Sequence, residues 1–160
     1  MRHMEMDDLL NDAEQRLRTG KAKEAAILLK SKAGGADADP RVLSLYGVAL
    51  AQSDISIYGF YRGLRLCGEA LKKGGEDPRL LVNLGKVNLY HGLREKAVQY
   101  MDRALKLAPD DPAVREAREE LGFRQRPRIP FMKREHRLNL ILGYLTVSVK
   151  RLFSRLARLD

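Results

Sequence analysis

Apolar residues with helical spacing occur along the chain in pairs of segments that are separated by short polar turns. In residues 78–111, the segment LLVNLGKVNLY is followed by the turn HGLRE and by a second segment, KAVQYMDRALKLAP. Gly85, Ala97 and Ala104 are small residues at the places where the two segments would have to approach closely. The pattern therefore predicts two antiparallel helices joined by a turn.

Three prolines mark the same point in successive units. Pro40, Pro78 and Pro112 each follow an aspartate, and each precedes a stretch with helical apolar spacing. The spacing from Pro78 to Pro112 is 34 residues, whereas the spacing from Pro40 to Pro78 is 38. We expect the four extra residues of the middle unit to lie in its turn, within residues 52–58.

Residues 78–111 resemble the tetratricopeptide repeat, a helix-turn-helix unit of 34 residues with small residues at fixed places and a proline near its end. The residues on this pattern are Leu81, Leu84, Gly85, Gly92, Ala97, Met101, Ala104 and Pro109. In residues 40–77 the same columns hold Leu43, Tyr46, Gly47, Leu50, Gly63, Cys67 and Ala70. In residues 6–39 they hold Leu9, Ala13, Gly20, Ala25 and Leu29, while Asp12, Arg16 and Lys32 depart from the apolar or small residue expected.

The resemblance implies an all-α superhelix of about three repeats, because stacked helical hairpins share one continuous core. The repeat domain would cover residues 6–122, with repeats at 6–39, 40–77 and 78–111. Residues 112–122 would form a polar helix that caps the end of the stack.

The first helix of each pair lines a concave face in tetratricopeptide arrays, and the resemblance implies the same arrangement here. The residues expected on that face are Leu10, Glu14, Arg41, Ser44, Leu45, Val48, Arg79, Val82, Asn83, Lys86, Leu89 and Tyr90. A groove with an apolar floor and a basic edge suits a peptide or amphipathic helix that carries acidic side chains. Some family members hold a terminal carboxylate with a clamp of Lys, Asn and Arg, but Leu10, Glu14 and Leu45 stand at three of its places.

The end of the chain is apolar and basic at once. Residues 123–132 contain two prolines and are predicted to form an extended linker, because proline and its preceding residue disfavour helix. Residues 133–160 are predicted to form a basic amphipathic helix. The seam of this helix, with alternate spacings of four and three, comprises Leu138, Leu142, Leu145, Val149, Leu152 and Leu156.

This apolar seam is expected to be buried against another surface, and three such surfaces are possible. The helix could pack on its own chain, either completing the fold or occupying the concave groove. It could also pair with another copy in a homodimer. Finally, it could lie on an anionic membrane surface, because amphipathic helices rich in arginine bind such surfaces.

Aromatic side chains cluster at the middle turn. Tyr58, Phe60 and Tyr61 follow Ile55 and Ile57 closely. We interpret these residues as packing against neighbouring repeats, since most aromatic residues of a domain this size belong to its core. Several exposed members would instead indicate an interface.

Composition and charge refine this picture. A chain of 160 residues with 44% hydrophobic residues can bury a core, so wholesale disorder is excluded. Of the net charge of +9, the residues from Arg124 onward carry +8, from ten basic and two acidic residues. An acidic or membrane partner is therefore expected for the basic tail. Nucleic acid is not favoured, because no aromatic residues are interleaved with the basic ones.

The candidate chemistry does not indicate an enzyme. The single cysteine, Cys67, excludes an internal disulfide and a cysteine-cluster metal site. His3, His91 and His136 are scattered, without a Cys, Asp or Glu at metal-ligand spacing. We expect a non-catalytic protein-binding scaffold without metal or cofactor. The polar, acidic N-terminus does not resemble a secretory signal, so we expect the protein to be cytoplasmic. The alternative is a peripheral membrane adaptor that is anchored by the C-terminal helix.

Overall fold

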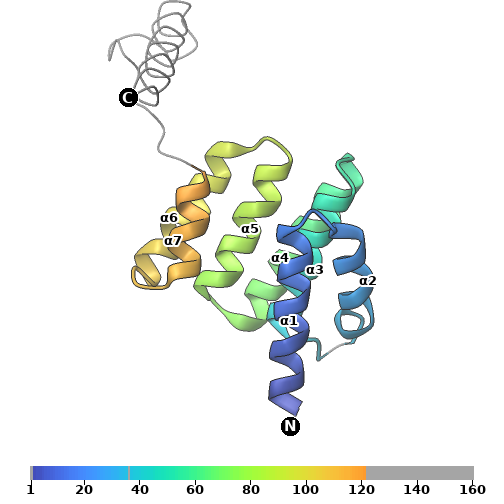
Figure 1. The fold of residues 1–160 in the computed structure, drawn as a ribbon. Coiled ribbons are helices and arrows are strands. Elements are labelled where there is room, and N and C mark those ends of the chain that lie inside the picture. Colours follow the sequence, from blue (N-terminus) through green and yellow to red (C-terminus); the bar gives the residue numbers. More distant parts are fainter. Residues whose placement is uncertain (1, 36, 122–160) are drawn as a thin grey trace, which may run out of the picture. The chain divides into compact units, whose positions relative to one another are not determined.

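The computed structural model describes residues 2–35 and 37–121, and this part of the chain is built from helices. Their order is α1 (Arg2–Arg18), α2 (Ala22–Ala33), α3 (Pro40–Ser53), α4 (Ile57–Gly74), α5 (Pro78–Tyr90), α6 (Arg94–Leu107) and α7 (Pro112–Glu120) (Figure 1). The described residues belong to one compact unit. The predicted linker and the predicted seam helix both lie outside the described residues. The all-α prediction is confirmed.

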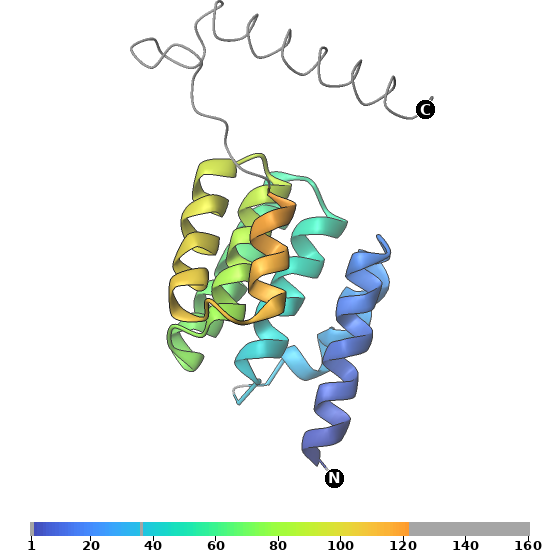
Figure 2. The same cartoon turned by 60° about the vertical axis from the view of Figure 1, so that its left-hand side comes forward.

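The helices of Met1–Gly122 are arranged as stacked antiparallel hairpins. Turns of three residues join α1 to α2, α3 to α4 and α5 to α6. The first helices of the hairpins follow one another, because α1 contacts α3, α3 contacts α5 and α5 contacts α7. Figure 2 shows α7 beside the α5–α6 hairpin, in the place where a further hairpin would begin.

The prolines and aspartates that punctuate the sequence start the helices. The carboxylates of Asp39, Asp77 and Asp111 accept hydrogen bonds from the backbone N–H groups of Arg41, Arg79 and Ala113, at 2.8, 2.7 and 2.8 Å. In each case the proline occupies the first helical position. There it loses no hydrogen bond, because the first N–H groups of a helix have no partner within it.

The extra residues of the middle hairpin lengthen its helices rather than its turn. The turn has three residues, 54–56, as does its counterpart at 91–93. In contrast, α4 has 18 residues where α6 has 14, and α3 has 14 where α5 has 13. The expected place, residues 52–58, is correct, but the expected loop is wrong. Ser56 caps α4 by accepting from the N–H of Gly59, which allows the helix to begin early.

Of the aromatic cluster at this turn, only Phe60 packs inward as expected. Its ring lies 4.6 Å from the ring of His91, between centroids. Tyr58 and Tyr61 are exposed, as are Ile55 and Ile57. The interpretation of the whole cluster as core is therefore wrong, because at the start of α4 only Gly59 and Phe60 are buried.

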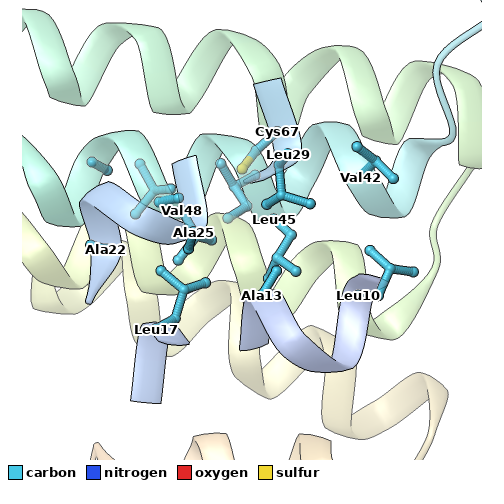
Figure 3. Packing of buried hydrophobic residues seen from close by; sticks show 14 of the residues in the cluster. Leu10, Ala13, Leu17, Ala22, Ala25, Leu29, Val42, Leu45, Val48 and Cys67 are labelled. Atoms are coloured by element: carbon cyan, nitrogen blue, oxygen red, sulfur yellow. The ribbon is translucent and has the colours of Figure 1, made fainter. Parts of the chain in front are cut away.

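Apolar residues from α1, α2 and α3 form the largest core cluster, together with residues of α4 and α5. In Figure 3, Ala13 and Leu17 of α1 lie with Leu29 of α2 and Leu45 of α3, and Cys67 reaches in from α4. Ala13, Leu29 and Cys67 are completely buried. Burial raises the pKa of the Cys67 thiol to about 12. The expectation that Cys67 is a small buried side chain agrees with this packing.

Polar residues of the first hairpin satisfy one another. The guanidinium of Arg16 contacts Asp12 one turn earlier and Glu24 on α2, each at 2.9 Å. Asp12 and Arg16 are two of the positions at which the first repeat departs from the family pattern. The Arg16–Glu24 ion pair thus links α1 to α2 beside the apolar contacts of Ala13 and Leu29.

Candidate functional site

A groove runs across the inner faces of the first helices. Its larger part is a hollow of about 330 Å³ lined by residues of α1, α3, α5 and α7 and by Met101. A second hollow of about 290 Å³ lies between α1, α3 and α5. The two hollows share Glu14, Leu45, Arg79 and Asn83 in their lining. We refer to them together as the inner groove.

The structure brings together all the residues that the sequence assigned to a concave face. Leu10, Arg41 and Ser44 line the smaller hollow, and Val48, Lys86 and the other members line the larger hollow or both. Their proximity follows from the stacking of α1, α3 and α5, which places equivalent helical positions side by side. Their role in binding stays a prediction.

The contribution of α7 was missed by the reasoning from sequence, which treated this helix only as a polar cap. Val114 and Ala117 of α7 are buried and line the groove, together with Glu116 and Glu120. The outward residues of α7 are charged, so the helix both covers α5 and extends the groove. The spacing of Val114 and Ala117, three residues apart, is the signal that could have revealed this face.

The floor of the groove is apolar. Leu45 and Val48 of α3, Val82 of α5 and Val114 of α7 supply it, and all four pack into the core beneath. The three valines of this floor are β-branched and therefore have restricted χ1 angles, so their side chains are stiff. A partner side chain that covers such a floor gains roughly 1.5–3 kcal/mol if it is large, apolar and fully buried.

The expected basic edge is largely neutralised within the chain. The guanidinium of Arg41 lies 3.0 Å from Asp39 and 2.9 Å from Asp7, between charged atoms. Arg79 lies 3.3 Å from Asp111, which is the cap of the next first helix. These pairs hold the arginines along the rim of the groove. They leave little net positive charge there to select an acidic partner.

Charges of the larger hollow are balanced in sign. Its acidic residues are Glu14, Glu116 and Glu120, and its basic residues are Arg18, Arg79 and Lys86. Arg18 of α1 and Glu116 of α7 approach to 3.2 Å, so one ion pair links the first described helix to the last. Both side chains are exposed, and an exposed pair contributes about 0–1 kcal/mol. The groove is therefore not locked shut by this contact.

Polar side chains inside the groove bond to one another. The Asn83 amide donates to the hydroxyl oxygen of Ser44 at 3.0 Å, and that hydroxyl donates to the carbonyl oxygen of Arg41 at 3.0 Å. Asn83 is thus engaged between α5 and α3, and Arg79 is paired with Asp111. A carboxylate clamp is not formed by these residues.

Tyr90 offers a polar group at the mouth of the groove. Burial, and after it the negative charge of Glu120, raise the pKa of the Tyr90 phenol above its ordinary value. The hydroxyl is therefore protonated at neutral pH and able to donate a hydrogen bond. The ring remains 38% exposed, so a ligand could cover it.

The described residues offer no sign of a metal centre or of a membrane span. In residues 2–35 and 37–121, no three His, Cys, Asp or Glu side chains are grouped so that they could hold a metal ion. Over the same ranges, none of the helices combines the length and the apolar character that crossing a bilayer requires.

Comparisons with known proteins bear on the fold. No family model matches the chain, and no curated protein matches it. A crystal structure of the TPR domain of P58(IPK) superposes with a TM-score of 0.50 at 18% sequence identity. The match covers 74% of this chain and 33% of that one, so the chain spans about a third of the P58(IPK) chain's length.

A second solved structure matches over most of its length. It is PcrH in complex with the chaperone binding region of PopB, with a TM-score of 0.50 and 16% identity. The match covers 72% of this chain and 90% of the PcrH chain. This chain has the tetratricopeptide-repeat fold. The exact bounds of the tetratricopeptide repeats, at 6–39, 40–77 and 78–111, stay a prediction.

Proposed function

We propose that this tetratricopeptide-fold protein is a non-catalytic interaction scaffold. Its inner groove would bind a peptide or an amphipathic helix of another protein. The observation that carries the proposal is the apolar floor formed by Leu45, Val48, Val82 and Val114, which lines a hollow of about 330 Å³ open to solvent.

The likeness to PcrH supports a protein ligand. That protein was crystallised with the chaperone binding region of PopB, and nine-tenths of its chain matches the present fold. A related arrangement of hairpins thus accommodates a segment of another protein. The low identity means that the chemistry of the ligand has to be inferred from the groove of this chain.

That chemistry combines an apolar floor with polar and charged side chains of both signs. Since the acidic and basic residues of the larger hollow balance, affinity would come from apolar anchors on the floor rather than from net charge. Lys86 makes no hydrogen bond or ion pair within the described part of the chain and could bind a ligand carbonyl or carboxylate. Tyr90 could donate a hydrogen bond at the mouth.

Peptide selection against the full chain would test the groove. We expect peptides isolated from a random 16-residue library to lose at least tenfold in affinity when Lys86→Glu or Tyr90→Ser is introduced. The exposed pair Tyr58→Ser/Tyr61→Ser serves as a matched control and should leave groove binding unchanged. A selection that yields no peptide whose affinity depends on Lys86 or Tyr90 would refute the proposal.

The seam at Leu138, Leu142, Leu145, Val149, Leu152 and Leu156 lies outside the described residues, and its role stays a prediction. It would complete the fold, occupy the groove in competition with a partner, or pair two copies. Deleting residues 131–160 tests whether this segment has any of these roles. A stable, monomeric remainder with unchanged peptide affinity would contradict the first two. Sedimentation with anionic liposomes at low and high salt tests the membrane alternative.

A further inference from the structure

The tip of the α3–α4 hairpin presents a contiguous apolar surface to solvent. Ile55 is 80% exposed, Ile57 56%, Tyr58 77% and Tyr61 63%. We call these four residues the tyrosine edge. Single exposed apolar residues are ordinary on proteins, but neighbouring ones on a single turn form a patch of the kind that marks interaction sites. Covering the two tyrosines alone would bury roughly 300 Å².

The turn that carries the tyrosine edge is fixed by its own hydrogen bonds. A carboxylate oxygen of Asp54 accepts from the N–H of Ser56 at 3.0 Å, and the hydroxyl oxygen of Ser56 accepts from the N–H of Gly59 at 3.4 Å. A Cβ atom on Gly59 would lie 2.0 Å from the carbonyl oxygen of Asp54, so the start of α4 rests directly on the end of α3. The apolar side chains cannot turn inward without breaking this arrangement.

Phe60 holds the same segment to the body of the fold. It is only 8% exposed, and its ring lies 4.6 Å from His91 on the next hairpin. With this residue directed inward, the 100° step of the helix directs Tyr58 and Tyr61 outward. A rigid, already exposed surface loses little conformational entropy when it binds. The geometry therefore suits recognition better than a loosely held loop would.

Charge beside the tyrosine edge indicates which partner fits. Arg62 and Arg65 continue the same exposed face of α4, and Arg65 is paired with Glu69 at 2.9 Å. Arg62 makes no hydrogen bond or ion pair among residues 2–35 and 37–121, although its charge acts on the nearby carboxylate of Asp54. A covering segment with acidic side chains would meet this guanidinium favourably. Tyrosine and arginine together are also typical of the residues that dominate protein interfaces.

Other occupants fit the charge less well. The seam at residues 138–156 is accompanied by Arg151 and Arg155, which would be repelled by Arg62. A second copy would bring the same edge with its own Arg62, and it would therefore add no surplus of acidic side chains.

We propose that the tyrosine edge is a second protein-binding site, separate from the inner groove. It would take an amphipathic segment of another protein that carries apolar side chains flanked by aspartate or glutamate. The site does not depend on the proposed function of the groove, because none of its residues lines that groove. A chain with both sites could hold two protein segments at once.

Two synthetic helical peptides provide the probes for the full chain. One carries leucine at positions i, i+3, i+4 and i+7 with glutamate between them, and the other has lysine in place of every glutamate. We expect the glutamate peptide to bind at least tenfold more tightly than the lysine peptide. Tyr58→Ser/Tyr61→Ser should weaken its binding at least tenfold, whereas the control Ile27→Ser, at an exposed apolar residue of α2 that lies in neither site, should leave it unchanged.

A charge reversal makes the test independent of folding effects. Arg62→Glu should weaken the glutamate peptide and strengthen the lysine peptide, a rescue that a misfolded variant could not show. Equal affinities of the two peptides, or indifference to Tyr58→Ser/Tyr61→Ser, would overturn the proposal. A dimer in analytical ultracentrifugation that Tyr58→Ser/Tyr61→Ser dissociates would overturn it in favour of a second copy. Liposome binding lost in that variant would overturn it in favour of a membrane.

Discussion

The α3–α4 and α5–α6 hairpins follow one repeat pattern but pack in opposite ways. In the first, Gly47 faces Gly63, and a Cβ atom on either would lie 2.8 Å from the other's carbonyl oxygen. In the second, Gly85 faces Met101, whose Cγ and Cε atoms would lie 3.0 and 3.2 Å from an added Cβ. One hairpin brings two backbones together, whereas the other fills the same space with a flexible side chain.

Equivalent positions of the two hairpins therefore differ in how well they tolerate a change in side-chain volume, although the fold is the same. Cys67 and Met101 occupy the same column of the repeat, and both are buried. Where the opposing residues are glycines in backbone contact, added volume has nowhere to go. Where a methionine fills the gap, added volume can be accommodated but removed volume leaves a cavity.

Removal of volume should therefore affect the α5–α6 hairpin more. We expect Met101→Ala to lower the free energy of unfolding by about 3 kcal/mol, because a large buried side chain is lost. Cys67→Ala should cost about 1 kcal/mol, since one small group is lost between close backbones. Urea unfolding measures both values. An equal or larger cost for Cys67→Ala would contradict the comparison.

Addition of volume should show the reverse order. Gly47→Ala is expected to cost about 2 kcal/mol, because the new methyl group meets the backbone of Gly63. Gly85→Ala should cost less than Gly47→Ala, since Met101 can move, the nearest backbone atom is the Ala97 carbonyl oxygen at 3.3 Å, and alanine favours helix over glycine by about 1 kcal/mol. Urea midpoints of the two variants test this expectation. Comparable losses of stability at both glycines would show that the Met101 side chain does not move aside.

The helix caps should have a smaller effect and should act alike in both hairpins. Asp77 accepts from the N–H groups of Arg79 and Leu80, at 2.7 and 3.3 Å. Asp77→Ala should lower the free energy of unfolding by about 1 kcal/mol, whereas Asp77→Asn should retain most of the cap. Thermal unfolding distinguishes the two variants. If asparagine proved as costly as alanine, the charge of Asp77 would matter more than its hydrogen bonds.

The smallest expected effect concerns pH and the turn at the tip of α3–α4. The hydrogen bond with the Ser56 side chain, followed by that with the Ser56 backbone, lowers the pKa of Asp54 below its ordinary value of 3.8. Because the pKa of Asp54 is lower in the folded state than in the unfolded state, its carboxylate stabilises the fold at pH values above the pKa of the unfolded state. That contribution is lost as pH falls through the folded value. Asp54→Asn should therefore reduce the loss of stability between pH 5 and about 3.

Unfolding of this variant in urea at each pH, beside the wild-type chain, measures the difference. The α5–α6 hairpin offers a comparison, because His91 stands at the start of its turn where Asp54 stands in the other. A wild-type-like acid response of Asp54→Asn would show that this carboxylate does not stabilise the turn.

The sequence alone determined the helices and their order. Asp39, Asp77 and Asp111, each followed by proline, act on neighbouring backbone groups, so their effect is visible in a short stretch. Small residues such as Gly85 and Ala97 show where paired helices approach. Because stacking then places equivalent positions side by side, the lining of the groove by the first helices also followed from the repeat.

Tertiary structure alone decided which side chains are available. Arg79 and Asp111 are separated by 32 residues, and their contact depends on how successive hairpins stack. The same holds for the place of Val114 in the groove and for the exposure of Tyr58, since a helix pattern does not say where its neighbours end. Helix formation depends on local contacts, whereas charge pairing and exposure depend on distances between segments that only the packed chain sets.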